Sequence, residues 1–296
     1  MAASLARLER APRSAETLGL LDAAWAASRA AVLGITGPPG VGKSTLLRAL
    51  IGRFRAAGES VGVIAVDPSS RRSGGALLGD RVRLQTDPDD QGLFVRSMAA
   101  RDRLGGLADL TVAAMVVMRA VYDRVLVETV GVGQSETEIA GVADSVLFCV
   151  QPGSGDALQF MKAGIVEIPD IAVVTKADLG APAERAVSDM RAALALAPGS
   201  GDGWDVPVLS VSADRQDGIE ALVEAIDGHG AFLRAQDRLQ ARRAAQARAW
   251  LHDGLRARFG SAGLERAGPL ELAEGQSPFS CLAAAAQRLE SAFGRA

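Results

Sequence analysis

The sequence has few of the residues that typify disulfide-rich, metal-binding or nucleic-acid-binding proteins. Its 296 residues include two cysteines, two histidines and one tyrosine, and aromatic residues make up only 4%. Cys149 and Cys281 lie far apart, and Cys149 falls in an apolar run that is typical of a buried strand. The formal net charge of -3 provides no bulk attraction to nucleic acid or to an anionic membrane. We therefore expect a reduced, cytoplasmic protein with no nucleic-acid or membrane partner.

Long hydrophobic runs are lacking as well. No segment is apolar enough over the length that a membrane-spanning helix or the core of an export signal requires. The N-terminal residues carry Arg7, Arg10 and Arg13 together with Glu9 and Glu16. Hydrophobic residues still make up 48% of the chain, which is enough for the core of one large α/β domain. We expect no export signal and no transmembrane helix.

Short apolar runs alternate with helical stretches along most of the chain. The predicted strands are Ala31 to Thr36, Ser60 to Val66, Leu93 to Arg96, Arg124 to Val130, Ser145 to Val150, Ile171 to Thr175 and Val206 to Val211. The predicted helices are Lys43 to Ala57, Leu107 to Val121, Ala181 to Leu196 and Gly218 to Ile226. Near-continuous apolar runs indicate strands that are buried on both faces. The sequence therefore predicts an α/β fold, with a mostly parallel sheet and helices on both faces.

The pattern changes towards both ends, which predicts three parts. These are an N-terminal helical segment (1–30), the α/β domain (31–230) and a C-terminal helical extension (231–296). The extension begins with an arginine-rich helix and, after a break at Gly268-Pro269, ends with a short helix from Cys281 to Phe293. Its larger apolar residues form a stripe, here called the C-terminal stripe: Leu239, Trp250, Leu251, Leu255 and Phe259. We expect the C-terminal stripe to pack against a second copy of the chain in a homodimer; the chain's own sheet domain is the alternative partner.

A phosphate-binding motif follows the first predicted strand and opens a helix. The run Gly37-Pro38-Pro39-Gly40-Val41-Gly42-Lys43-Ser44-Thr45 matches the pattern G-x-x-x-x-G-K-[ST]. The glycines allow successive backbone N–H groups to point at phosphate oxygens, next to the positive end of the helix dipole. We expect Lys43 to reach the β- and γ-phosphates, Ser44 to bind Mg²⁺ and Thr45 to contact the α-phosphate. An ordinary glycine-rich turn is the alternative.

Three acidic residues near strand ends are candidates for a magnesium site. Asp67 and Glu128 end predicted strands, and Asp80 lies in a glycine-rich loop. A carboxylate at the end of a buried strand is costly unless a cation or hydrogen-bond donors compensate it, and Mg²⁺ prefers oxygen ligands. We expect Ser44 and these three acids around the metal, with Lys43, Asp80 and Glu128 as the catalytic set. A self-capping turn is the alternative for Asp67, and a solvated loop for Asp80.

Two further segments point to a nucleotide that acts as a switch. In Glu128-Thr129-Val130-Gly131, the N–H of Gly131 can bond the γ-phosphate and release it after hydrolysis. A flexible glycine turn is the alternative. Thr175-Lys176-Ala177-Asp178 follows another predicted strand, and the Asp178 carboxylate can accept the two adjacent donors of guanine, which adenine does not have. Ser212-Ala213 can donate a backbone N–H to the guanine oxygen. The predicted ligand is therefore GTP or GDP.

Several of these runs together are similar to the MeaB/ArgK group of GTPases. They are Gly37 to Thr45, Val66 to Ser70, Gly74-Gly75 with Gly79-Asp80, Arg96 to Met98, Leu104 to Ala108 and Glu128 to Glu136. The resemblance implies a homodimeric GTPase that uses Mg²⁺ and chaperones an adenosylcobalamin-dependent acyl-CoA mutase, gating cofactor loading and protecting the mutase. It also brings an older description, a kinase or ATPase of lysine/arginine/ornithine transport.

The resemblance assigns roles residue by residue. Lys43, Ser44 and Thr45 match phosphate and metal positions, and Asp67, Asp80 and Glu128 match acids around magnesium. Residues 153–162 are similar to a switch segment that communicates with the mutase. The chain departs from the usual family residues at four positions: Asp102 replaces Gly, Ala157 replaces Glu, Ala163 replaces Lys and Thr175 replaces Asn.

Three other functions compete with the mutase chaperone. A nickel-insertion GTPase needs clustered His or Cys ligands, and the two histidines, His229 and His252, are far apart in the sequence. An ATP-using transport kinase needs a phosphoacceptor site, for which the sequence shows no motif. A binding-only relative would bind GTP with turnover that no partner stimulates.

Overall fold

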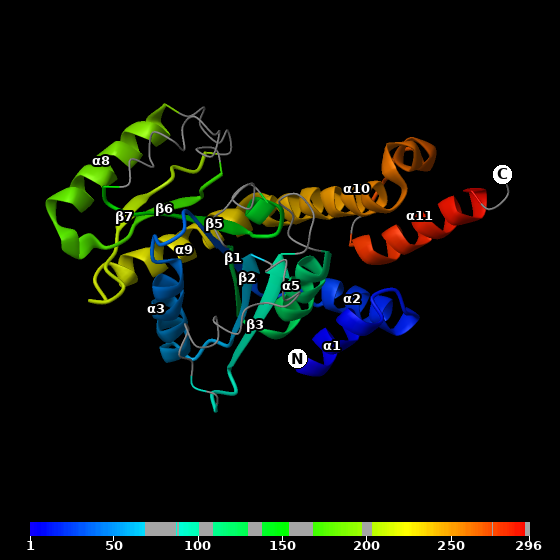
Figure 1. Ribbon diagram of the computed structural model, residues 1–296, viewed down its shortest axis with the longest axis horizontal. Coiled ribbons are helices and arrows are strands. Elements are labelled where there is room, and N and C mark those ends of the chain that lie inside the picture. Colours follow the sequence, from blue (N-terminus) through cyan, green and yellow to red (C-terminus); the bar gives the residue numbers. More distant parts are fainter. Residues whose placement is uncertain are drawn as a thin grey trace.

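The sheet is the centre of the molecule (Figure 1). The protein is described by a computed structural model for residues 1–68, 87, 89–100, 109–129, 138–153, 168–196, 203–273 and 275–293. Within these residues the strands are β1 (Ala31–Thr36), β2 (Val61–Pro68), β3 (Leu93–Ala100), β4 (Arg124–Glu128), β5 (Ser145–Val150), β6 (Ile171–Val174) and β7 (Val208–Ser210). They form one sheet in the order β3-β2-β4-β1-β5-β6-β7, and each neighbouring pair is parallel. The predicted parallel α/β fold is confirmed.

Helices cover both faces of this sheet. Those within the described residues are α1 (Ala2–Arg10), α2 (Ala15–Ala26), α3 (Lys43–Ala56), α5 (Asp109–Val121), α8 (Ala181–Ala195), α9 (Ile219–Arg234), α10 (Arg238–Ala267) and α11 (Pro278–Phe293). Short 3₁₀ helices are η1 (Ile139–Gly141), η3 (Ala177–Leu179) and η4 (Ala235–Asp237). None of the helices in the described part of the chain has both the length and the apolar character needed to cross a bilayer.

The two faces of the sheet bury different sets of side chains, because successive residues of a strand point to opposite sides. On one face, α3 and α9 pack over residues such as Leu33, Ile35 and Leu147. On the other, α5 with α1 and α2 covers residues such as Val32 and Val146, and α8 covers the far strands. β1 is buried from Val32 to Thr36, which agrees with its continuous apolar sequence.

Helix α9 runs past Ala231, the residue at which the sequence predicts the C-terminal extension to begin. Ala231 lies within α9, which continues to Arg234 because Leu233 is still buried against the domain. The chain turns at Gln236 and Asp237, whose φ angles are 57° and 58°. Non-glycine residues rarely adopt this left-handed conformation, and it ends the helix. The change in composition at Ala231 therefore does not mark the end of a helix.

The C-terminal stripe finds apolar partners within the chain. Figure 1 shows α10 extending away from the sheet and α11 lying beside it. Leu251 and Leu255 pack against α11, where Ala286 and Leu289 are also buried. Trp250 meets Trp25 of α2 edge-to-face, with ring centroids 6.1 Å apart. The C-terminal stripe therefore does not by itself require a second copy of the chain.

Two ion pairs dock the start of α10 on the edge of the sheet where the strands begin. Arg243 binds Asp144, with Nη2 2.6 Å from Oδ2, and the same carboxylate accepts the Val32 N–H. Arg242 binds Asp170 through both terminal nitrogens, at 3.1 and 3.0 Å. Because fork-shaped Arg–carboxylate pairs fix orientation as well as distance, α10 is held in a defined position on the domain.

Candidate functional site

The glycines of the predicted phosphate loop adopt conformations that other residues avoid. The loop joins the end of β1 to the start of α3, and its three glycines, Gly37, Gly40 and Gly42, have φ angles of 137°, 76° and 100°. A Cβ atom on Gly37 would lie 2.2 Å from the carbonyl oxygen of Cys149, so a side chain there is excluded. These conformations turn the chain at the N-terminus of α3, where backbone N–H groups and the helix dipole favour an anion.

Lys43 is held inside this loop. Its side chain is buried, and its Nζ donates to the carbonyl oxygens of Gly37, at 2.7 Å, and Pro38, at 2.9 Å. A buried ammonium requires compensation of this kind. The cation is thus fixed beside the loop amides, where it can add its charge to theirs around a phosphate group.

Ser44 and Glu128 meet next to the loop. The Ser44 hydroxyl donates to Glu128 Oε1 at 2.8 Å. Glu128 ends β4, where it is in register with Ile35 of β1 and Ala65 of β2. Among the described residues no three His, Cys, Asp or Glu side chains are grouped so as to hold a metal ion. A hydroxyl and a carboxylate are nevertheless the hard oxygen ligands that suit Mg²⁺, which completes its shell with waters and phosphate oxygens.

Thr45, the predicted contact of the α-phosphate, lies in the first turn of α3. Three other predicted ligands, Asp67, Asp80 and Gly131, lie wholly or partly outside the described residues. Asp80 and Gly131 are outside them. The backbone of Asp67 is in β2, paired with Ala99 of β3, so it ends its strand at the same edge of the sheet as Glu128. Arg96 forms an ion pair with Glu9 of α1.

Thr175 joins the predicted base-binding segment to the phosphate loop. Its hydroxyl lies 2.6 Å from the carbonyl oxygen of Val41 and 3.0 Å from that of Val150, and its side chain is buried. The Thr175 N–H also donates to Val150, at 2.8 Å. A hydroxyl has a single proton, and Val150 already has a donor, so the bond to Val41 is the one that depends on the side chain.

Lys176 makes a second connection between the same two segments. It also contacts Gln151, a residue that the sequence did not single out. It has a left-handed backbone, with φ 55°, and its Nζ donates to Gly40 at 3.2 Å and to Gln151 Oε1 at 2.6 Å. Gln151 immediately follows β5. Its position at the carboxyl end of a central strand is a signal that could have identified it, because ligands of parallel sheets bind at that edge.

The Asp178 carboxylate is oriented by the segment that follows β7. Asp178 Oδ1 accepts the Ser212 hydroxyl at 2.7 Å, and this bond is the main cause that lowers the pKa of Asp178 below its usual value. The Ser212 N–H donates to Asp217 at 3.0 Å. Of the two amides predicted to reach a purine oxygen, Ser212 thus has another acceptor, and Ala213 is the remaining candidate.

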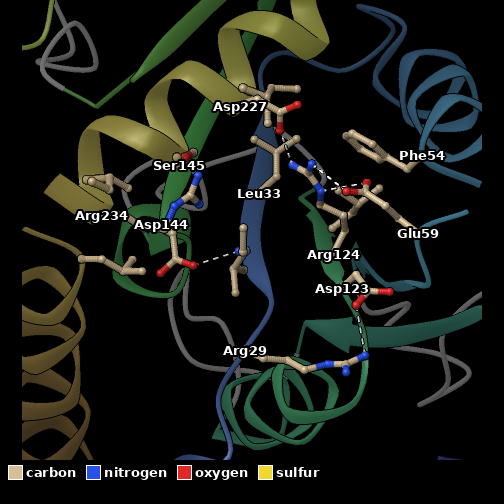
Figure 2. A pocket seen from close by; sticks show the side chains of 17 residues that line it. Arg29, Leu33, Phe54, Glu59, Asp123, Arg124, Asp144, Ser145, Asp227 and Arg234 are labelled. Carbon is tan, nitrogen blue, oxygen red and sulfur yellow. Dashed lines mark hydrogen bonds and ion pairs between the residues drawn. The ribbon is translucent and has the colours of Figure 1, made fainter. Parts of the chain in front are cut away.

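A separate cavity of about 340 Å³ lies at the opposite edge of the sheet. Figure 2 shows that its charged side chains face one another: Arg124 is held between Glu59 and Asp227, and Arg29 binds Asp123. Because these charges neutralise each other, the cavity offers no concentrated charge to a phosphate group. The predicted phosphate loop, and not this cavity, is the candidate site.

Comparison with known proteins identifies the family. A family model described as methylmalonyl-CoA mutase-associated GTPase MeaB matches residues 2–262. The chain is 47% identical over 215 residues to a putative GTPase of Pyrococcus abyssi, a match that covers 72% of the chain and 66% of that protein. It is 36% identical over 222 residues to the mitochondrial methylmalonic aciduria type A homolog of mouse, with 74% and 54% covered. The chain thus spans about two thirds of the first relative and about half of the second.

A solved structure agrees with this match. The crystal structure described as an LAO/AO transport system kinase shares 30% sequence identity with the chain and superposes with a TM-score of 0.70. The match covers 98% of the chain and 92% of the solved structure. It therefore includes the terminal helices as well as the sheet.

Proposed function

Because the chain belongs to the MeaB family of P-loop GTPases, we propose that it is a GTP-hydrolysing chaperone of an adenosylcobalamin-dependent acyl-CoA mutase. In this proposal it acts in the cytoplasm as a homodimer, gates cofactor loading and protects the mutase. The family description names a methylmalonyl-CoA mutase, and the mouse relative is named after methylmalonic aciduria. Both names favour a methylmalonyl-CoA mutase as the partner.

The observation that carries the proposed chemistry is the convergence of two segments on the phosphate loop, through three contacts. Glu128 reaches the loop through Ser44, Thr175 through Val41, and Lys176 through Gly40. Phosphoryl transfer depends mainly on positioning and on charge stabilisation. Glu128 contacts the loop from the predicted metal site, and Thr175 and Lys176 contact it from the predicted base site. Contacts from both directions fix the position of the loop.

Different residues of the site would bind the phosphates, the metal ion and the base. Lys43 and the backbone amides at the start of α3 stabilise negative charge on the β- and γ-phosphate oxygens. Ser44 and Glu128 would hold Mg²⁺, with Asp67 and Asp80 as further candidates. When bound, the ion neutralises charge on the phosphate oxygens. Asp178 and the Ala213 amide would select guanine, because a mismatched base leaves buried polar groups unpaired.

Substitution of Lys43 tests the chemistry. We expect Lys43→Ala to abolish GTP hydrolysis and to weaken GTP binding strongly, since it removes a cation that the structure fixes inside the loop. Hydrolysis is measured by phosphate release and binding by calorimetry. Hydrolysis at the unsubstituted rate would refute the assignment.

The partner is tested by co-elution of the purified chain with a methylmalonyl-CoA mutase, in GDP and in a non-hydrolysable GTP analogue. We expect association that differs between the two nucleotides. No association in either state would refute the chaperone role.

The name of the solved structure favours a second candidate, a transport-system kinase. Parallel titrations with GDP and ADP separate the two. Preference for ADP, together with transfer of phosphate to a protein, would support the kinase.

A further inference from the structure

The polypeptide that follows Glu128 starts from a fixed point beside the phosphate loop. The Thr129 N–H donates to the carbonyl oxygen of Ile35 at 3.0 Å. The Thr129 hydroxyl donates to the hydroxyl oxygen of Thr36, also at 3.0 Å. Thr129 and Thr36 are both buried. Thr129 is therefore tied to the end of β1.

The same polypeptide arrives at a second fixed point, η1. Ile139 is fully buried, and a Cβ atom on Gly34 of β1 would lie 2.4 Å from its Cγ1. A Cβ there would also lie 2.9 Å from that of Ala143. Only a glycine in β1 permits η1 to approach the strand so closely.

Two residues of α10 hold η1 from its other side. Gln246 Nε2 donates to the carbonyl oxygens of Ala140, at 3.0 Å, and Ala143, at 2.8 Å. Trp250 Nε1 donates to Gly141 at 2.8 Å. Three backbone carbonyl groups in and next to η1 thus accept hydrogen bonds from side chains of the C-terminal extension.

We propose that Gln246 and Trp250 are positioning residues for GTP hydrolysis. By holding the carbonyl groups of η1 they fix the far end of the segment that begins at Glu128, and they set the rate of the chemical step without touching the nucleotide. The inference rests on the proposed GTPase chemistry and adds a role for α10 in it. A partner that shifts α10 would change the rate of hydrolysis through these two side chains.

The burial of Gln246 favours this role over simple stabilisation. Its side chain is 6% exposed, and its amide oxygen is buried without a hydrogen-bond partner among the described residues. An unsatisfied buried oxygen lowers stability, so leucine would suit the position at least as well for packing alone. What leucine cannot provide is the pair of N–H donors that Gln246 directs at Ala140 and Ala143.

The test uses the full chain and two substitutions that keep the shape of the side chain. Gln246→Leu removes the amide, and Trp250→Phe removes the indole N–H while keeping an aromatic ring against Trp25. We expect kcat for GTP to fall by roughly 5- to 100-fold in each variant, because small misplacements of a reacting group have effects of this size. The Kd for GDP should stay within about twofold of its original value, since the proposal leaves the contacts to the diphosphate intact.

Arg242→Leu is the matched control. It breaks another contact of α10, the ion pair with Asp170, which does not involve η1, and it leaves the Arg243–Asp144 pair to hold the start of α10 in place. We expect it to lower the thermal unfolding temperature and to leave kcat unchanged. Unchanged kcat in both test variants, or an equal fall in the control, would overturn the inference while leaving the GTPase assignment in place. A chain that hydrolyses no GTP at all would overturn the proposed function, and the inference with it.

Discussion

The hydroxyl of Thr175 offers a quantitative test of how the base-binding segment supports the phosphate loop. Thr175→Val keeps the shape of the side chain and removes its only donor. Val150 keeps the bond from the Thr175 N–H, so the loss falls on the carbonyl oxygen of Val41, at the centre of the loop. An acceptor that loses its buried donor costs about 1–3 kcal/mol.

That cost should appear mainly in nucleotide affinity. Val41 precedes the first turn of α3, whose amides we propose bind the phosphates together with Lys43. Without its donor, the Val41 carbonyl can turn to water, and the loop must then be reordered when the nucleotide binds. If about 1–2 kcal/mol of the cost is incurred on binding, the Kd for GDP rises by about 5- to 30-fold. Isothermal titration calorimetry with GDP measures this directly. Thr175→Ser, which restores a hydroxyl, should recover most of the affinity.

The control is another buried threonine. The Thr111 hydroxyl on α5 is buried without a hydrogen-bond partner among the described residues, so Thr111→Val removes an unsatisfied group and should leave GDP affinity unchanged. Unchanged GDP affinity in Thr175→Val, with a lower unfolding temperature, would show that the hydroxyl only stabilises the fold. An equal loss of affinity in Thr111→Val would show that the effect is not specific to the loop.

Three further outcomes follow from the same structure. Arg243→Leu leaves the buried Asp144 without its cation and should lower the free energy of unfolding by about 3–5 kcal/mol in urea titrations. Burial raises the pKa of Cys149 to about 12, so iodoacetamide at neutral pH should label the partly exposed Cys281 and spare Cys149, as mass spectrometry would show. Because the pKa of Asp178 is lowered, its charged form persists below the usual range. The preference for GDP over ADP should therefore stay constant on acidification to about pH 5 and fall only when the pH drops through that lowered pKa, because both nucleotides share the titration of the terminal phosphate; calorimetry with both nucleotides at several pH values can check this.

The sheet and the phosphate loop could be predicted because their signals are local. β1 and β5 have the bounds that their apolar runs predict, and α3 begins at Lys43, where the motif places it. β7 is shorter than predicted, covering only Val208–Ser210 at the edge of the sheet. An edge strand has one neighbour to pair with, so its apolar run need not all join the ladder.

Contacts between distant segments could not be predicted in the same way. Ser212 and Ala213 are equivalent candidates in the sequence, and only the bridge to Asp217 shows that the Ser212 N–H already has an acceptor. The contacts of Gln246 with η1 join residues more than a hundred positions apart. From the sequence alone, a polar residue in an arginine-rich helix is expected to be exposed to solvent. Only the fold shows that Gln246 is buried next to carbonyl groups that accept its hydrogen bonds.

The aspartates that precede β5 and β6 attach α10 to the sheet. Asp144 accepts the Val32 N–H, Asp170 accepts the Val146 N–H, and each then binds an arginine of α10. Buried ion pairs contribute little net stability compared with apolar packing, but breaking one leaves a costly charge behind. Such pairs therefore act mainly to fix the orientation of α10. The helix is anchored where the strands begin and contacts η1 further along its length, so a displacement of its far end would be passed to η1 and to the polypeptide that follows Glu128.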